Sequence, residues 1–257
     1  MVTFLAADIV ERLLTMLWPM ARISALLLIA PVLSLDAVTV RIRIVFAFVL
    51  TVFIYPLFDW PVIDPTTAPG LVELANQITI GILMGLILQV VLAAVATGGQ
   101  AIAGSMGLSM ANMMDPSLGN VPVLSSFLVI LASLIFLGLG GHVMLLELLI
   151  QSFEMIPIGK ALLSLNAIGQ LLTWSSMMFL GAVLLALPLL VILLAVNLGL
   201  GVVVRAAPTL NIFAVGFPAM LLAGMAMLYI LMGAVGGRLQ WLWQAAFTQL
   251  RTIIGLE

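Results

Sequence analysis

The chain has 257 residues, of which 65% are hydrophobic and 7% charged, and its formal net charge is −2. Soluble domains average about 45–50% apolar and about 25% charged residues, so a water-soluble fold of this length could not hide so much apolar surface. There is no cluster of Lys and Arg suited to nucleic acid, and the lack of cysteine excludes disulfides, thiolate nucleophiles and Cys-type metal sites.

Six apolar runs are long enough to be membrane-spanning helices, which need about 20 residues. The fifth run is too long for one straight span, and Pro188 inside it is expected to kink or break it. The sequence therefore predicts an all-α, polytopic membrane-type bundle of about six long, partly kinked hydrophobic helices, in a single domain over residues 1–257. The six runs cover about Leu13–Leu33, Ile44–Trp60, Leu71–Thr97, Val123–Ile150, Ile168–Val204 and Leu210–Gly236.

Two segments differ from these runs. Residues 98–122 are rich in Gly and Met and carry one charge, so we expect a re-entrant loop that folds into protein or lines a cavity. The methionines in this loop either form an adaptable apolar seal or simply fill apolar sequence. Residues 238–257 form an amphipathic helix, suited equally to a membrane surface and to a partner subunit.

Ionisable groups inside apolar helices are costly unless they are paired. Arg22 lies too far inside the first helix to snorkel well, so we favour a buried partner over snorkelling or a local carboxylate pair. His142 and Glu147 point about 140° apart, which makes them a poor metal or proton-relay pair. We expect His142 to be a hydrogen-bonded side chain in a packed bundle and Glu147, with Gln151 and Glu154, to mark the polar end of its helix.

The sequence contains no feature of an enzyme active site. It lacks a Gly-x-Ser-x-Gly motif, a Ser–His–acid set, paired aspartates and a phosphate-binding loop, and we expect no cofactor or metal. A secondary transporter of small molecules remains an alternative, with Arg22, His142 or Arg205 as its substrate or proton site. That class is usually built from inverted repeats, and no repeat relates the two halves of this chain.

Several motifs together resemble the FliR family of flagellar export-gate proteins. They are GLSMANMMDPSLGNVPV followed by a helix ending in FLGLGGH, Arg22-x-Ser24 with Ala30-Pro31, VRIR at Val40–Arg43, and LALPLLVILLAVNLGLGVVVRAAPTLNIFAVGFP. The resemblance runs essentially end to end. The related injectisome family shares most of these features, and the first helix and the arginine pair favour the flagellar branch.

The resemblance implies a subunit that assembles with FliP and FliQ into the gate of a type III secretion apparatus, and that associates with FlhB. It places the chain at the flagellar basal body in the bacterial inner membrane, with much of the gate raised towards the periplasm and its helices buried against neighbouring subunits. Unfolded flagellar proteins would pass through the pore. By match to the family, the pore plug comprises Gly107, Met110, Asn112, Met113, Met114, Asp115, Pro116, Gly119 and Pro122; subunit or intramembrane polar contacts would come from Arg22, His142, Glu147, Arg205 and Asn211.

Overall fold

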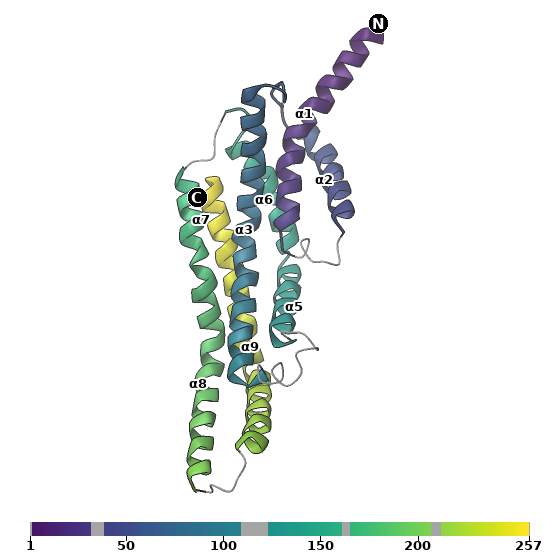
Figure 1. Ribbon diagram of the computed structural model, residues 1–257. Coiled ribbons are helices and arrows are strands. Elements are labelled where there is room, and N and C mark those ends of the chain that lie inside the picture. The colour runs from purple at the N-terminus through teal and green to yellow at the C-terminus, as the bar shows by residue number, and fades with distance from the viewer. Residues whose placement is uncertain (1, 32–38, 109–122, 161–164, 207–211, 257) are drawn as a thin grey trace. The chain divides into compact units, whose positions relative to one another are not determined.

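The computed structural model describes residues 2–31, 39–108, 123–160, 165–206 and 212–256. Over these ranges the chain is helical and contains no strand (Figure 1). The helices are α1 (Val2–Ile29), α2 (Val40–Ile54), the short 3₁₀ helix η1 (Tyr55–Leu57), α3 (Ala68–Ser105), α5 (Val123–Gly138), α6 (Gly141–Met155), α7 (Leu165–Ser175), α8 (Met177–Ala206) and α9 (Ile212–Ile254).

The predicted membrane-type architecture is confirmed. Among the described residues, five helical segments are long and apolar enough to cross a bilayer, and there are six if the broken pair α5 and α6 counts as one span. The predicted single helix over Val123–Ile150 is wrong in one respect, because it breaks between Gly138 and Gly141. Gly140 has a φ of 72°, a left-handed conformation that glycine adopts without the strain a side chain would add.

The break in the fifth apolar run lies at Ser176, between α7 and α8, and not at Pro188, through which α8 continues. A proline inside a membrane helix removes one backbone hydrogen bond, which neighbouring groups can compensate, so it does not have to end the helix. The carbonyl of Ser176 accepts hydrogen bonds from the N–H groups of Phe179 and Leu180, both at 3.1 Å, which start α8.

The C-terminal segment is not a separate amphipathic helix, because α9 runs without interruption from Ile212 to Ile254. Its apolar face is as the sequence predicts, but that face is buried by the chain itself and not left for a membrane surface or a partner. The buried residues are Leu239, Leu242, Trp243, Ala246, Leu250, Ile253 and Ile254. Gln240, Gln244, Thr248 and Arg251 lie outside this face.

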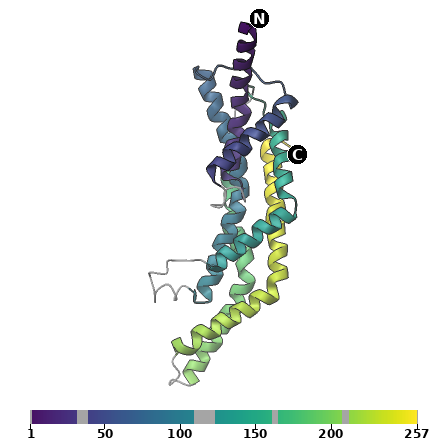
Figure 2. The same cartoon turned by 90° about the vertical axis from the view of Figure 1, so that its right-hand side faces the viewer.

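The chain divides into two compact units. Unit 1 comprises Met1–Val90, Gly140–Ser175 and Ala245–Glu257, and unit 2 comprises Val91–Leu139 and Ser176–Gln244. In unit 1, α1 and α2 lie side by side (Figures 1 and 2). Each unit is held by close helix packing at small residues.

Unit 1 is packed where α3 meets α1. A Cβ atom on Gly81 would clash with the backbone oxygen of Arg22, and one on Gly85 would lie 2.8 Å from the Cβ of Ile29. The two glycines, four residues apart on one face of α3, therefore allow the backbones of α1 and α3 to approach closely. Trp174 of α7 adds a polar tie, because its indole N–H donates to the carbonyl of Ile87 at 2.9 Å.

Unit 2 uses the same device along the second half of α3. A Cβ atom on Gly99 would lie 2.7 Å from the Cα of Ser125, whose hydroxyl donates to the carbonyl of Ala96 at 2.9 Å. The indole N–H of Trp243 donates to the carbonyl of Ala132 at 3.0 Å, and its ring packs 4.8 Å from that of Phe136. Small residues thus let α3 approach α5, and a buried tryptophan joins α9 to α5.

Candidate functional site

The buried polar cluster of unit 1 is centred on Arg22 of α1, whose side chain is completely buried. Its Nε–H donates to Oε1 of Gln77 at 2.7 Å, and Nη1 donates to the carbonyl and hydroxyl of Ser152 at 2.7 and 3.0 Å. Nη2 donates to the carbonyl of Ile156 at 2.8 Å. Four of the five N–H donors of the guanidinium are therefore satisfied by α3 and by the end of α6.

The guanidinium acts as a cap on the C-terminus of α6. The last carbonyls of a helix have no partner within the helix and carry partial negative charge, so a cation there is favourable. Ser152 fits this arrangement, because its hydroxyl donates to the carbonyl of Leu149 at 2.6 Å while its oxygen accepts from Arg22. The partner expected for Arg22 thus comes from the same chain, through backbone carbonyls that sequence patterns do not display.

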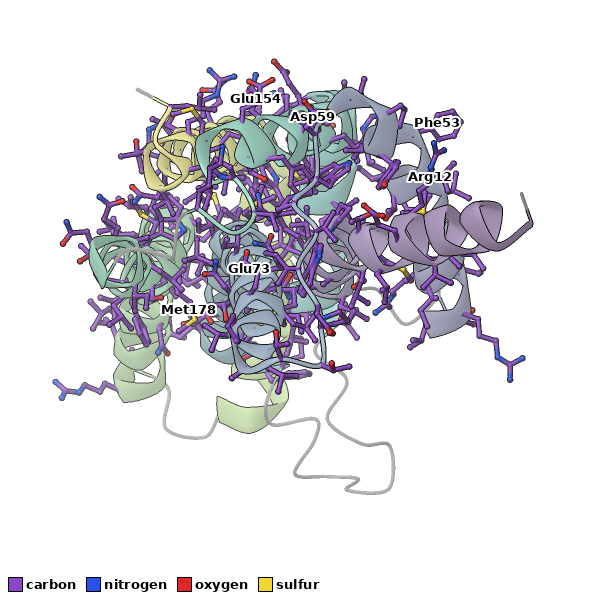
Figure 3. The ribbon with its side chains drawn as sticks, turned by 90° about the horizontal axis from the view of Figure 1, so that it is seen from above. Arg12, Phe53, Asp59, Glu73, Glu154 and Met178 are labelled. Carbon is purple, nitrogen blue, oxygen red and sulfur yellow. The ribbon has the colours of Figure 1, made fainter. Side chains whose placement is uncertain are left out.

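The charge of Arg22 is balanced across one intervening side chain. The amide nitrogen of Gln77 donates to Oε1 of Glu73, one helical turn earlier on α3, and the Glu73 carboxylate attracts the guanidinium electrostatically. Glu73 and Gln77 are both buried. In Figure 3, Glu73 lies towards the middle of the helices, whereas Asp59 and Glu154 lie at their edge. A cation, an amide and a carboxylate therefore form one buried chain of polar contacts.

Aromatic side chains close one side of this cluster. The guanidinium carbon of Arg22 lies 4.3 Å from the centre of the Phe153 ring, within the range of a cation–π contact. Trp60 packs edge-on against the same ring at 5.4 Å, and its indole N–H donates to the carbonyl of Tyr55 at 2.7 Å. The hydroxyl of Tyr55 in turn shares a 2.7 Å hydrogen bond with that of Thr15 on α1.

Glu73, Gln77 and Ser152 are partners of Arg22 that the sequence patterns do not predict. A signal for two of them was present, since Glu73 and Gln77 are spaced four residues apart in the first turns of an otherwise apolar helix and so share a face. Ser152 and the carbonyl of Ile156 gave no comparable signal. They are more than 125 residues from Arg22 in the chain, and one of them is a backbone group.

The other residues predicted to make polar contacts lie apart from this cluster. His142 is exposed in the first turn of α6, so the prediction of a histidine packed within the bundle is wrong for the chain by itself. Glu147 is exposed and accepts a 3.2 Å hydrogen bond from Gln151. Arg205 is exposed in the last turn of α8, and Asn211 lies outside the described residues.

Only the base of the predicted plug loop belongs to the described residues. Helix α3 extends to Ser105, so the loop begins later than the sequence predicts, because Gly98 and Gly99 pack closely within unit 2. Met106 is fully buried against Gly224 of α9, and Gly107 follows with a φ of 79° beside the ring of Phe217. The remaining plug residues, Met110, Asn112, Met113, Met114, Asp115, Pro116, Gly119 and Pro122, lie outside the described residues.

The hydrogen bonds of the Arg22 cluster are all made within unit 1. Within the described ranges, no group of three or more His, Asp or Glu side chains is placed to hold a metal ion. The donors of Arg22 are directed at carbonyls and an amide of the chain itself. These hydrogen bonds hold α1, α3 and α6 together in unit 1.

Large apolar side chains cover much of the outside of the chain. In the span Val40–Leu57 only 17% of the most apolar window is buried, and in Gly216–Ile254 only 22%. Beyond Leu193, none of the α8 residues whose burial the structure describes is buried. Surfaces of this size on a soluble monomer would be exceptional, so each must meet lipid or protein.

Comparison with known proteins gives matches over most of the chain. The family model described as "Bacterial export proteins, family 1" matches residues 13–246. The chain is 38% identical to a protein named flagellar biosynthetic protein FliR from Escherichia coli K12, over 92% of this chain and 91% of that protein. Proteins with the same name from Pectobacterium carotovorum and Bacillus subtilis are 34% and 30% identical, over 99% and 83% of this chain and 98% and 84% of their own.

Proposed function

The chain belongs to the FliR family of bacterial flagellar export proteins, and from this premise we propose that it is a structural and gating subunit of the type III protein export gate. With FliP and FliQ it forms the pore through which unfolded flagellar proteins pass, and it associates with FlhB. The gate lies at the flagellar basal body in the inner membrane, raised towards the periplasm. The chain itself catalyses no reaction.

The observation that carries this proposal is the extent of apolar surface left bare by the chain. Helices α8 and α9 expose large apolar side chains, among them Leu198 and Tyr229. A subunit whose helices are completed by neighbours has this character, because obligate interfaces resemble a protein core cut in two. The family membership indicates which neighbours to expect.

The Arg22 cluster argues against the small-molecule transporter. A substrate site needs polar groups that turn towards the ligand, whereas four donors of Arg22 are engaged by groups of the chain and the side chain is completely buried. His142 and Arg205, the other two candidates, are exposed, with His142 in unit 1 and Arg205 in unit 2. The injectisome alternative finds no support in the relatives described above, which are all named as flagellar.

The gating part of the proposal concerns the loop from Gly107 to Pro122. Its described base is fixed to α9, because Met106 is buried against Gly224 and Gly107 lies under Phe217. A loop with an anchored base can close a pore with its apolar, methionine-rich middle. In this proposal Arg22 makes its polar contacts within the chain. The contacts to neighbouring subunits come from His142, Glu147, Arg205 and Asn211.

The test is a deletion of a few residues within 109–122, introduced into the gate assembled with FliP and FliQ. We expect assembly to continue and the closed pore to leak ions, measured as conductance across a planar bilayer. An unchanged conductance in a complex of normal composition would show that this loop is not the plug. The full-length assembled gate is the control.

A further inference from the structure

The exposed surface of α2 differs in composition from the other bare apolar surfaces. We define the outer face of α2 as the seven large apolar residues that point away from its buried stripe of Ala47, Thr51 and Ile54. All seven are exposed, with Phe53 at 72% the most open. They are Ile42, Val45, Phe46, Phe48, Val49, Val52 and Phe53.

We propose that the outer face of α2 contacts the acyl chains of the lipid bilayer in the assembled gate, so that α2 lies at the lipid boundary and not between subunits. Figure 3 shows Phe53 projecting away from the neighbouring helices. The buried stripe packs on the inner side, where α2 lies beside α1. Only this narrow stripe of α2 is therefore buried by the chain itself, and the apolar remainder of the helix must be covered by lipid or by another protein.

Composition favours lipid over a partner helix. Helices that associate within a membrane do so through small residues that let backbones approach, and through polar side chains that bond across the interface. The outer face of α2 has neither, because every member is aromatic or β-branched. The last turns of α8 show the opposite composition, since Asn197, Gly199 and Gly201 are exposed there. The small and polar residues of those turns suit contact with a partner helix, whereas the bulky apolar residues of α2 suit contact with lipid acyl chains.

The dimensions and ends of α2 also match a bilayer. The 18-residue span Val40–Leu57 is roughly 27 Å long at about 1.5 Å per residue, close to the roughly 30 Å hydrocarbon layer. Arg41 is exposed at the start of the helix, one turn before Val45 on the same side, where a cation meets lipid phosphates. Tyr55 and Trp60 stack at the other end, and such residues are enriched at the membrane–water interface.

The chain contains no cysteine, so a single introduced cysteine can carry a nitroxide spin label. Labels are placed at Ile42→Cys, Val49→Cys and Phe53→Cys, with Leu198→Cys on α8 as a control of similar exposure. The gate is assembled with cysteine-free FliP and FliQ in vesicles of phosphatidylethanolamine and phosphatidylglycerol. Collision rates with apolar oxygen and with a water-soluble nickel complex are then compared at each site.

We expect oxygen collisions to exceed nickel collisions severalfold at Val49 and Phe53, with a smaller ratio at Ile42 nearer the headgroups. Oxygen collisions at Leu198 are expected to fall on assembly. A severalfold loss of oxygen collisions at both Val49 and Phe53 on assembly would show that a subunit covers α2, and dominant nickel collisions would show that water does. Co-purification of FliP and FliQ in the same sample tests the proposed function separately, so failure of one is distinguishable from failure of the other.

Discussion

Replacing Arg22 by methionine tests whether the buried cluster holds unit 1 together. Methionine keeps much of the volume and removes every donor. The amide oxygen of Gln77 and the carbonyls of Ser152 and Ile156 then lose their charged donor, and the Glu73 carboxylate loses the cation that balances it. The carbonyl of Ser152 keeps its bond from the N–H of Ile156, but the loss of a charged donor and of a balancing cation inside the protein is a source of large destabilisation.

The expected cost follows from these groups. A hydrogen bond from a charged donor contributes about 1.5–3 kcal/mol, but bonds that share one guanidinium are not additive. Removing one partner of a buried ion pair costs about 3–5 kcal/mol, and we expect the total to fall in that range. For a chain of this size that corresponds to a fall of roughly 10 °C in the unfolding temperature.

The assay is thermal unfolding of the purified protein in detergent, followed by tryptophan fluorescence, with Glu73→Gln in both backgrounds. In the presence of Arg22, Glu73→Gln should destabilise the protein. After Arg22→Met it should restore part of the lost stability, because it removes an uncompensated carboxylate. Arg22→Lys should lie between wild type and Arg22→Met, since lysine keeps the charge but cannot reproduce the planar fork. A cost below about 1 kcal/mol for Arg22→Met would refute this reasoning.

Three further predictions concern packing, a buried hydrogen bond and a loop carboxylate. Gly81→Val should lower the unfolding temperature by more than Gly138→Val, because a Cβ atom on Gly81 would clash with the backbone of α1 whereas Gly138 has open space around it. Equal effects of the two substitutions would contradict the packing of α1 on α3. Trp243→Phe should cost about 1–3 kcal/mol by chemical unfolding, since it removes the buried indole hydrogen bond to α5 and part of the indole ring; no change would contradict that contact. Asp64 accepts hydrogen bonds from the side chain and backbone of Thr66, which lower its pKa below the ordinary 3.8. The stability it adds is therefore present above that value and lost as pH falls through the lowered pKa, so Asp64→Asn should abolish this part of the pH dependence of unfolding.

The sequence was sufficient to predict the helices but not their ends. Hydrophobic runs identify spans because lipid and buried protein both demand apolar residues along a whole helix. The break at Gly140 was missed because three glycines in an apolar run are compatible with a continuous membrane helix. The continuation of α3 through Gly98 and Gly99 was missed for the opposite reason, since glycines there suggested a loop, whereas close packing against Ser125 retains them in a helix.

The candidate site was only partly predictable for a related reason. The cost of a buried cation makes Arg22 conspicuous in any sequence, and it implies that a partner exists. It does not say which one, because two of the groups that satisfy Arg22 are backbone carbonyls at the end of α6. Hydropathy gives the same score to a residue that faces lipid, a neighbouring subunit or its own chain. That is why the buried face of α9 over residues 239–254 and the exposed outer face of α2 are equally apolar in sequence.

The most direct test of the proposed function is co-purification of the tagged chain from cells that express its native operon. We predict that FliP and FliQ are recovered with it in a defined complex, each in excess over this chain, and that FlhB associates with that complex. A tagged chain that is stable in the membrane and is recovered without FliP and FliQ would contradict its role as a subunit of the export gate.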